Sequence, residues 1–213
     1  VRVIAVDADF RMCASALAEA ITVDRAAGLT PFLVVSSAGT TNTGAVDPLD
    51  AVADLTAREA LWHHVDGAYG GAGLVSPRLR PQYAGIERAD SFIVDPHKWL
   101  FAPYDCCALV YRDADAAEAA HAQHASYLDH VDRDVANPSD LAIHLSRRAR
   151  GLPLWFSLAT HGTDRYAAAV DRTVEIARAV AQGIAQTPYL RLLQEPELTV
   201  LLFERPGWDG GDY

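Results

Sequence analysis

Short apolar runs alternate with helical patterns through the first two thirds of the chain. Five runs predict strands buried on both faces, because they are mostly continuous in apolar residues: residues 2–6, 31–37, 61–65, 91–94 and 107–111. Between the first two, Cys13, Leu17 and Ile21 recur at helical spacing and Gly28 follows as a stop, which predicts a crossover helix. This alternation predicts an α/β fold with a mainly parallel sheet covered by helices.

The polar positions predict where further helices begin and end. Asp47 as N-cap and Pro48 at the first helical position indicate a helix that runs to about residue 59. A helical pattern covers residues 114–122, and the polar stretch 130–140, which has no clear period, predicts a mobile loop. Residues 143–158 and 164–186 predict long helices, and residues 198–203 predict a strand.

These elements predict two parts. Residues 1–145 are expected to form part of a large domain, and residues 146–213 the connecting helices and the start of a smaller C-terminal α+β domain. A lone strand at residues 198–203 would leave its backbone groups unpaired. We therefore expect the sequence to stop within that second domain.

Composition narrows the classes of function. The chain has 213 residues, 50% hydrophobic, and a net charge of −10 from 28 acidic and 18 basic residues, without a basic cluster for nucleic acid. No apolar run approaches the roughly 20 residues that span a bilayer, and the first residues lack the features of a signal peptide. These features predict a soluble, cytoplasmic protein. Cys13, Cys106 and Cys107 are an odd set with spacing unsuited to disulfides or zinc, which predicts reduced, buried thiols.

Three polar segments follow successive predicted strands, where open α/β sheets bind ligands. They are Gly-Thr-Thr-Asn-Thr-Gly at 39–44, His-Val-Asp-Gly-Ala-Tyr-Gly-Gly at 64–71, and Asp-Pro-His-Lys-Trp-Leu at 95–100. Taken singly, each has an ordinary explanation: a turn, a helix cap or a solvated lysine. Because the three follow neighbouring strands, we predict that Lys98 and Asp66 face one pocket at the C-terminal edge of the sheet.

The second and third segments resemble the group II pyridoxal-phosphate decarboxylases, the family of aromatic-L-amino-acid decarboxylase and glutamate decarboxylase. In that family the cofactor lysine follows Pro-His and precedes Trp, and the pyridine-binding aspartate lies upstream in His-Val-Asp-x-Ala-Tyr. The resemblance extends from about Val1 through Leu-Ser-Arg-Arg-Ala-Arg-Gly-Leu-Pro-Leu-Trp at 145–155. It implies the type I fold of pyridoxal-phosphate-dependent transferases, pyridoxal 5'-phosphate as cofactor, and a homodimer whose active site lies between subunits.

The resemblance also implies roles for particular residues. Lys98 would form the Schiff base with the cofactor, and Asp66 would keep the pyridine nitrogen protonated, because a nearby anion favours a charged partner. The remaining cofactor contacts rest on the resemblance alone: Ala68 against the ring face, Thr41 on the ring-oxygen side, and Ser91 and His97 near the phosphate or the Schiff base.

This sequence departs from the family pattern in two ways. The family's stacking histidine and main phosphate loop would lie N-terminal to Val1, and family members are longer at both ends, so we expect a fragment. The family's mobile loop also carries a tyrosine after an aspartate, which protonates Cα, whereas here Asp140 precedes Leu141. Without that acid, decarboxylation is expected to be slow or to divert towards an aldehyde, unless Tyr127 or His144 donates the proton.

The leading hypothesis is a carboxy-lyase that converts an L-amino acid, with aromatic side chains as the favoured class, to the amine and carbon dioxide. One alternative keeps the cofactor but gives a transamination product or an aldehyde. Another is a non-catalytic remnant that supplies a dimer surface. No metal is expected, since the histidines at 63–64 and the His121-x-x-His124 pair lack acidic or cysteine partners at ligand spacing.

Overall fold

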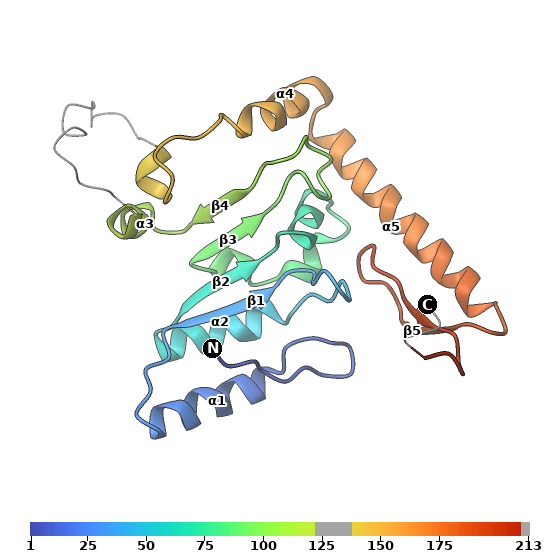
Figure 1. Cartoon of the computed structure of the whole chain (residues 1–213), viewed down its shortest axis with the longest axis horizontal. Coiled ribbons are helices and arrows are strands. Elements are labelled where there is room, and N and C mark those ends of the chain that lie inside the picture. The colour runs from blue at the N-terminus through green and yellow to red at the C-terminus, as the bar shows by residue number, and fades with distance from the viewer. Residues whose placement is uncertain (122–137, 210–213) are drawn as a thin grey trace.

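The computed structural model describes residues 1–121 and 138–209, and within them a four-stranded sheet holds the centre of the molecule (Figure 1). Strands β1 (Leu33–Ser37), β2 (Trp62–Asp66) and β3 (Ser91–Val94) are parallel, in that order across the sheet. Strand β4 (Ala108–Tyr111) pairs with β3 in the antiparallel direction, Ser91 opposite Tyr111. The predicted α/β architecture with a mainly parallel sheet is therefore confirmed. The predicted burial on both faces is wrong for the two outer strands of this sheet, since β1 buries only alternate residues and β4 buries none.

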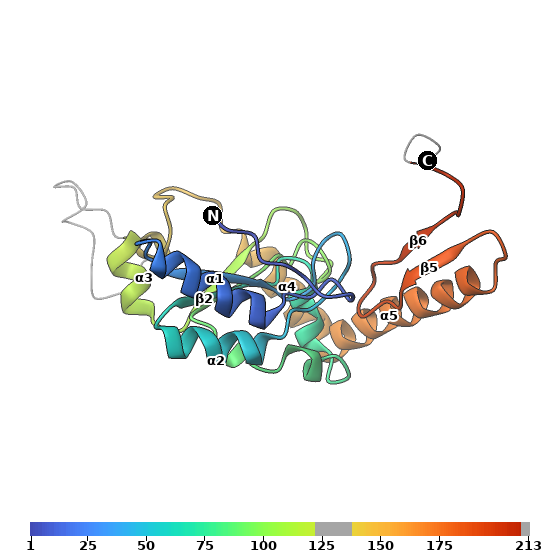
Figure 2. The same ribbon diagram turned by 90° about the horizontal axis from the view of Figure 1, so that it is seen from below.

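Helices α1 (Ala14–Ala26) and α2 (Leu49–Glu59) cover one face of this sheet (Figure 2). Leu17 and Ile21 of α1 pack with Val34 of β1 and with Val52 and Leu55 of α2. The predicted crossover helix is confirmed, since the spacing of Leu17 and Ile21 places both on one face of α1.

Two predictions about the first fifty residues are wrong. The run at residues 2–6 forms no strand: it makes one isolated bridge, Val6 to Met12, and Val3 is exposed, because no described strand lies beside it to pair its backbone. Asp47 does not cap α2, whose N-cap is Pro48. Its carboxylate instead accepts hydrogen bonds from the backbone N–H groups of Met12 and Ser37, each at 2.7 Å. Asp47 therefore joins the residues just before α1 to the end of β1.

The remaining helices follow β4. Helix α3 (Ala114–His121) agrees with its prediction, and α4 (Gly151–His161) and α5 (Thr163–Ala185) follow, with short 3-10 turns η1 (Gly70–Val75), η2 (Arg80–Tyr83), η3 (Ile86–Arg88) and η4 (Pro138–Leu141) elsewhere. The helix predicted over 143–158 begins only at Gly151, and most of the loop predicted over 130–140 lies outside the described residues. None of the helices in the described ranges is both long and apolar enough to cross a membrane.

The last predicted strand is shorter than expected and has a partner. Strand β6 (Leu202–Glu204) pairs antiparallel with β5 (Arg191–Gln194), which the sequence pattern missed, so the expectation of an unpaired strand is wrong. Figures 1 and 2 show this pair beside α5. Val170 and Val174 of α5 share one core cluster with Val65 of β2, so the division near residue 145 stays a prediction.

Candidate active site

The carboxyl ends of β1, β2 and β3 meet at one edge of the sheet, where Asp66 ends β2 and the loops after β1 and β3 carry Thr41 and Lys98. Two glycines let the first two loops touch. A Cβ on Gly70 would lie 2.3 Å from the carbonyl oxygen of Ala38 and 2.6 Å from Cα of Gly39, so no larger residue fits this crossing.

The lysine loop is a tight turn closed by hydrogen bonds. The backbone N–H of Lys98 donates to the carbonyl of Asp95 at 2.9 Å, and the ammonium Nζ of Lys98 lies 2.9 Å from Oδ2 of Asp95. The N–H of Asp95 donates to the carbonyl of Ala68 at 3.0 Å, which ties this loop to the segment after β2. The candidate lysine is thus held at the sheet edge by its own loop.

The thiol of Cys107 is hydrogen-bonded to the carboxylate of Asp95, which also pairs with Lys98. Partial desolvation of the thiol sulfur, in a residue that is exposed as a whole, and its hydrogen bond to Asp95 raise the pKa of Cys107 to about 11. The three cysteines are free, as predicted, but only Cys106 is buried: Cys13 is half-buried and Cys107 is exposed. The raised pKa makes Cys107 a poor nucleophile near neutral pH despite its exposure.

Lys98 lines a cavity of about 360 Å³. The lining combines two predicted residues, Lys98 and Thr41, with four that were given no role: Tyr69, Trp99, Thr199 and Val200. Tyr69 and Trp99 belong to the quoted motifs and could have been found from them. Thr199 and Val200 carry no motif and lie about 100 residues downstream of Lys98 in the sequence, so only folding brings them to the site.

Asp66 ends β2 at the same edge. Its side chain is exposed, and Oδ1 accepts a hydrogen bond from the N–H of Ala68 at 3.0 Å. Asp66 is not among the residues that line the Lys98 cavity. The predicted edge is therefore correct for both residues, while a pocket shared by Lys98 and Asp66 stays a prediction.

The ring of His97 is fixed beside the lysine. Its Nδ1 lies 2.6 Å from the carbonyl oxygen of Cys106, and its ring meets Tyr104 edge to face at 4.9 Å between centroids. The backbone N–H of Cys106 also lies 3.3 Å from Nδ1, but the shorter contact to the carbonyl favours the tautomer with the proton on Nδ1. In that tautomer Nε2 is the nitrogen left to act as acceptor in the neutral ring.

A family model described as the pyridoxal-dependent decarboxylase conserved domain matches residues 1–205. The chain belongs to this family. The family inferred from the motifs around Asp66 and Lys98 is therefore confirmed.

Relatives and solved structures agree with this assignment. The chain is 35% identical over 201 residues to the aromatic-L-amino-acid decarboxylase of Bacillus atrophaeus, covering 92% of this chain and 42% of the relative. It is 38% identical over 202 residues to the L-2,4-diaminobutyrate decarboxylase of Rhizobium meliloti (strain 1021), covering 94% and 41%. The chain thus spans less than half the length of these relatives.

Two solved structures share the fold. The crystal structure of Oryza sativa TDC with PLP and tryptamine superposes with a TM-score of 0.91 at 33% identity, covering 95% of this chain and 42% of that one. The crystal structure of Rhodiola rosea 4-hydroxyphenylacetaldehyde synthase gives 0.88 at 28% identity, covering 96% and 42%. This similarity confirms the predicted α/β fold of type I.

Ser91 lies away from the decarboxylase motif lysine. It begins β3, about 10 Å along the strand from Val94, and its buried hydroxyl accepts from the indole Nε1 of Trp62 at 2.8 Å and meets Nδ1 of His64 at 2.8 Å. This position at the opposite end of the strand does not support a contact with the Lys98 amine.

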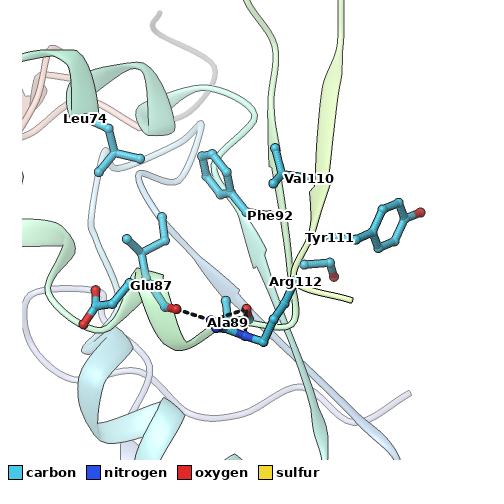
Figure 3. A pocket seen from close by; sticks show the side chains of 9 residues that line it. Leu74, Glu87, Ala89, Phe92, Val110, Tyr111 and Arg112 are labelled. Atoms are coloured by element: carbon cyan, nitrogen blue, oxygen red, sulfur yellow. Dashed lines mark hydrogen bonds between the residues drawn. The ribbon is translucent and has the colours of Figure 1, made fainter. Parts of the chain in front are cut away.

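Ser91 instead lines a second cavity, of about 340 Å³ (Figure 3). Arg112 is the basic side chain among the described residues that line it, and its guanidinium donates to the carbonyl oxygens of Ala89 and Glu87. These hydrogen bonds join Arg112, the residue after β4, to the backbone just before β3. None of the residues predicted to carry the chemistry, apart from Ser91, lies in this cavity.

The position of the family's loop tyrosine, Leu141, lies at the other end of the sheet from Lys98. Leu141 ends η4, which packs against α3, and α3 follows Tyr111, the partner of Ser91 at the opposite end of the sheet (Figure 1). His144 is exposed, and Tyr127 lies in the part of the chain that the structure leaves out. Across the residues that the structure does describe, no three His, Cys, Asp or Glu side chains gather as metal ligands.

Proposed function

We propose that this chain carries the cofactor lysine of a pyridoxal-phosphate-dependent carboxy-lyase, which converts an L-amino acid to its amine and carbon dioxide. The observation that carries the proposal is Lys98, whose side chain opens into a cavity at the sheet edge from a loop matching the family's motif. Membership of the family supports the reaction type, whereas the activity of the whole protein remains part of the proposal.

The residues at this edge fit the cofactor. Lys98 supplies a primary amine for an aldehyde, Thr41 a hydroxyl in the same cavity, and Asp66 an exposed carboxylate. Within the described part of the chain Asp66 uses only Oδ1, for the N–H of Ala68, which leaves Oδ2 for a further partner. An amine, a hydroxyl and a carboxylate are the groups needed for the aldehyde, the ring oxygen and the ring nitrogen of pyridoxal phosphate.

When bound, pyridoxal phosphate supplies an aldehyde carbon that accepts an amine and a ring that takes up the electrons released with carbon dioxide. Lys98 would provide the amine that holds it and that the substrate's amino group displaces. Asp66 would keep a proton on the ring nitrogen, because an anion at short range favours the cationic ring. His97, with Nδ1–H held by Cys106, would present Nε2 as an acceptor on the lysine loop.

The substrate proposed is an aromatic amino acid. Tyr69 and Trp99 supply aromatic walls to the Lys98 cavity, and they stack with ring centroids 5.3 Å apart. Relatives named for aromatic amino acids match along most of this chain, which supports the same class. The similarly close diaminobutyrate relative makes a substrate panel essential to the test.

An aldehyde product is the second candidate. Leu141, which follows Asp140 where the family places a tyrosine, has no proton to give. Because η4 lies at the far end of the sheet from Lys98, a contribution from this position requires a second copy of the chain or a rearrangement. The similarity to the Rhodiola rosea aldehyde synthase supports keeping this product in view.

We propose that the protein works as a homodimer in the cytoplasm. Support for association comes from α4, where the side chains of Trp155 and Phe156 are each 60% exposed and Leu152 is 52% exposed. A contiguous apolar surface of this kind typically marks an interface. Gel filtration with light scattering would test it: a fully active monomer would contradict the dimer.

The test of the function uses the full-length protein loaded with pyridoxal phosphate. We expect a visible absorption band, and borohydride should fix the cofactor on Lys98 in a peptide identified by mass spectrometry. Lys98→Ala should lose both the band and carbon dioxide release. Amine, aldehyde and keto acid are then measured separately for aromatic amino acids and for 2,4-diaminobutyrate. Cofactor fixed on another lysine, or no carbon dioxide from any of these substrates, would refute the proposal.

A further inference from the structure

The segment Leu198–Val200 packs closely against the loops that carry the site. Leu198 is fully buried, and a Cβ added to Gly70 would lie 2.7 Å from its Cδ1. A Cβ added to Gly44 would lie 3.2 Å from Cβ of Val200. The segment therefore reaches the loops after both β1 and β2, although α5 and β5 separate it from them in the sequence.

Tyr69 fastens this segment to the lysine loop. The N–H of Thr199 donates to the hydroxyl oxygen of Tyr69 at 3.1 Å, and the hydroxyls of Thr199 and Tyr69 are also hydrogen-bonded. The ring of Tyr69 stacks on Trp99, the neighbour of Lys98, whose indole N–H in turn donates to Thr173 of α5 at 2.8 Å. Burial raises the pKa of Tyr69, so its hydroxyl keeps its proton near neutral pH.

We propose that Thr199 and Val200 form the wall of the Lys98 cavity that selects substrate side chains by size, and that Tyr69 is the positioning residue that holds this wall. The inference rests on the proposed function and deepens it. Among the cavity's lining residues Thr199 and Val200 come from outside the motif-bearing loops. Both are β-branched and stiff at χ1, so their methyl groups are fixed in place and cannot swing aside for a larger ring.

Truncation of the wall tests selection by size. In the full-length holoenzyme, Val200→Ala removes two methyl groups, and we expect the ratio of kcat/KM for tryptophan to that for phenylalanine to rise about 10-fold. Val180→Ala makes the same truncation on the exposed surface of α5, away from the cavity, and should leave the ratio unchanged. An unchanged ratio in Val200→Ala, with wild-type activity intact, would overturn the inference and leave the proposed function standing.

Tyr69→Phe tests the positioning role because it keeps the stacked ring and removes only the hydroxyl. We expect KM for tryptophan to rise several-fold, with kcat and the visible cofactor band unchanged, since the wall loosens while the lysine loop stays stacked. Amide hydrogen exchange at Thr199, measured without cofactor, should quicken. Faster exchange with KM unchanged would show that Tyr69 only packs the fold, and would overturn its role in the site.

The two failures remain distinguishable. A wild-type protein that releases no carbon dioxide and fixes no cofactor on Lys98 would overturn both the function and the inference. A wild-type protein that decarboxylates aromatic substrates, but whose Val200 and Tyr69 variants keep its selectivity and KM, would overturn the inference alone.

Discussion

The buried ring of His63 makes the stability of this fold depend on pH. His63 is the second residue of β2, with 1% of its surface exposed, and its Nε2 is 2.7 Å from the hydroxyl of Ser36. Its Nδ1 has no hydrogen-bond partner among the described residues. Burial lowers the pKa of His63 from 6.5 to about 4, and the charge of Asp90 opposes this only in part.

The direction follows from proton uptake. The unfolded chain takes a proton on this ring near pH 6.5, whereas the folded chain takes it only near pH 4, so stability falls as the pH falls through that window. Between pH 7 and pH 5 the difference in proton binding corresponds to about 2 kcal/mol, at 1.36 kcal/mol per pKa unit. Below about pH 4 both states carry the proton and the effect levels off.

The perturbation is His63→Gln, whose amide nitrogen can still reach Ser36 but does not titrate. Urea unfolding of the cofactor-free protein at pH 5, 6 and 7 gives the free energy of unfolding. We expect the wild type to lose about 2 kcal/mol more than the variant between pH 7 and 5. His144→Gln, at an exposed histidine, should keep the wild-type slope. Equal slopes for the wild type and His63→Gln would refute the reasoning.

Three further substitutions test the packing and chemistry of the site. Gly70→Ala places a Cβ 2.3 Å from the carbonyl oxygen of Ala38, so we expect thermal unfolding to show a loss of about 1–3 kcal/mol in the free energy of unfolding. As a control, Gly183→Ala in α5 places a Cβ with nothing within 4 Å and should stabilise the fold. An unchanged stability in Gly70→Ala would contradict the close approach of the two loops. Asp66→Asn removes the anion proposed for the ring nitrogen and should slow carbon dioxide release on the order of 10- to 1000-fold while borohydride still fixes the cofactor; an unchanged rate would remove Asp66 from that role. Leu141→Tyr should raise the share of amine over aldehyde, and an unchanged rate and product ratio would show that this position does not supply the proton.

Much of the central sheet follows from sequence alone. The apolar runs that became β1, β2, β3 and β4 are continuous enough to predict strands, so local hydrophobicity determines that they are extended. It does not determine their cover, since β1 buries only alternate residues and β4 buries none among the described residues. The lysine motif is equally local, since Asp95 closes the turn of Lys98 from three residues away. For such elements, the residues that decide the structure are neighbours in the chain.

Partners distant in the sequence decided the rest. The run at 2–6 is as apolar as β1 but forms no strand without a described neighbour, while β5, with a weaker pattern, pairs with β6. The sequence around Asp47 is typical of a helix N-cap, yet its carboxylate accepts hydrogen bonds from the backbone N–H groups of Met12 and Ser37 instead. Thr199 is held at the Lys98 cavity by the hydrogen bond from its N–H to the hydroxyl of Tyr69, which lies 130 residues earlier in the sequence. The hydrophobic pattern of a segment depends on that segment alone. Strand pairing, the partners of a buried carboxylate and the walls of a cavity depend on which distant segments lie beside it, and only the tertiary structure decides that.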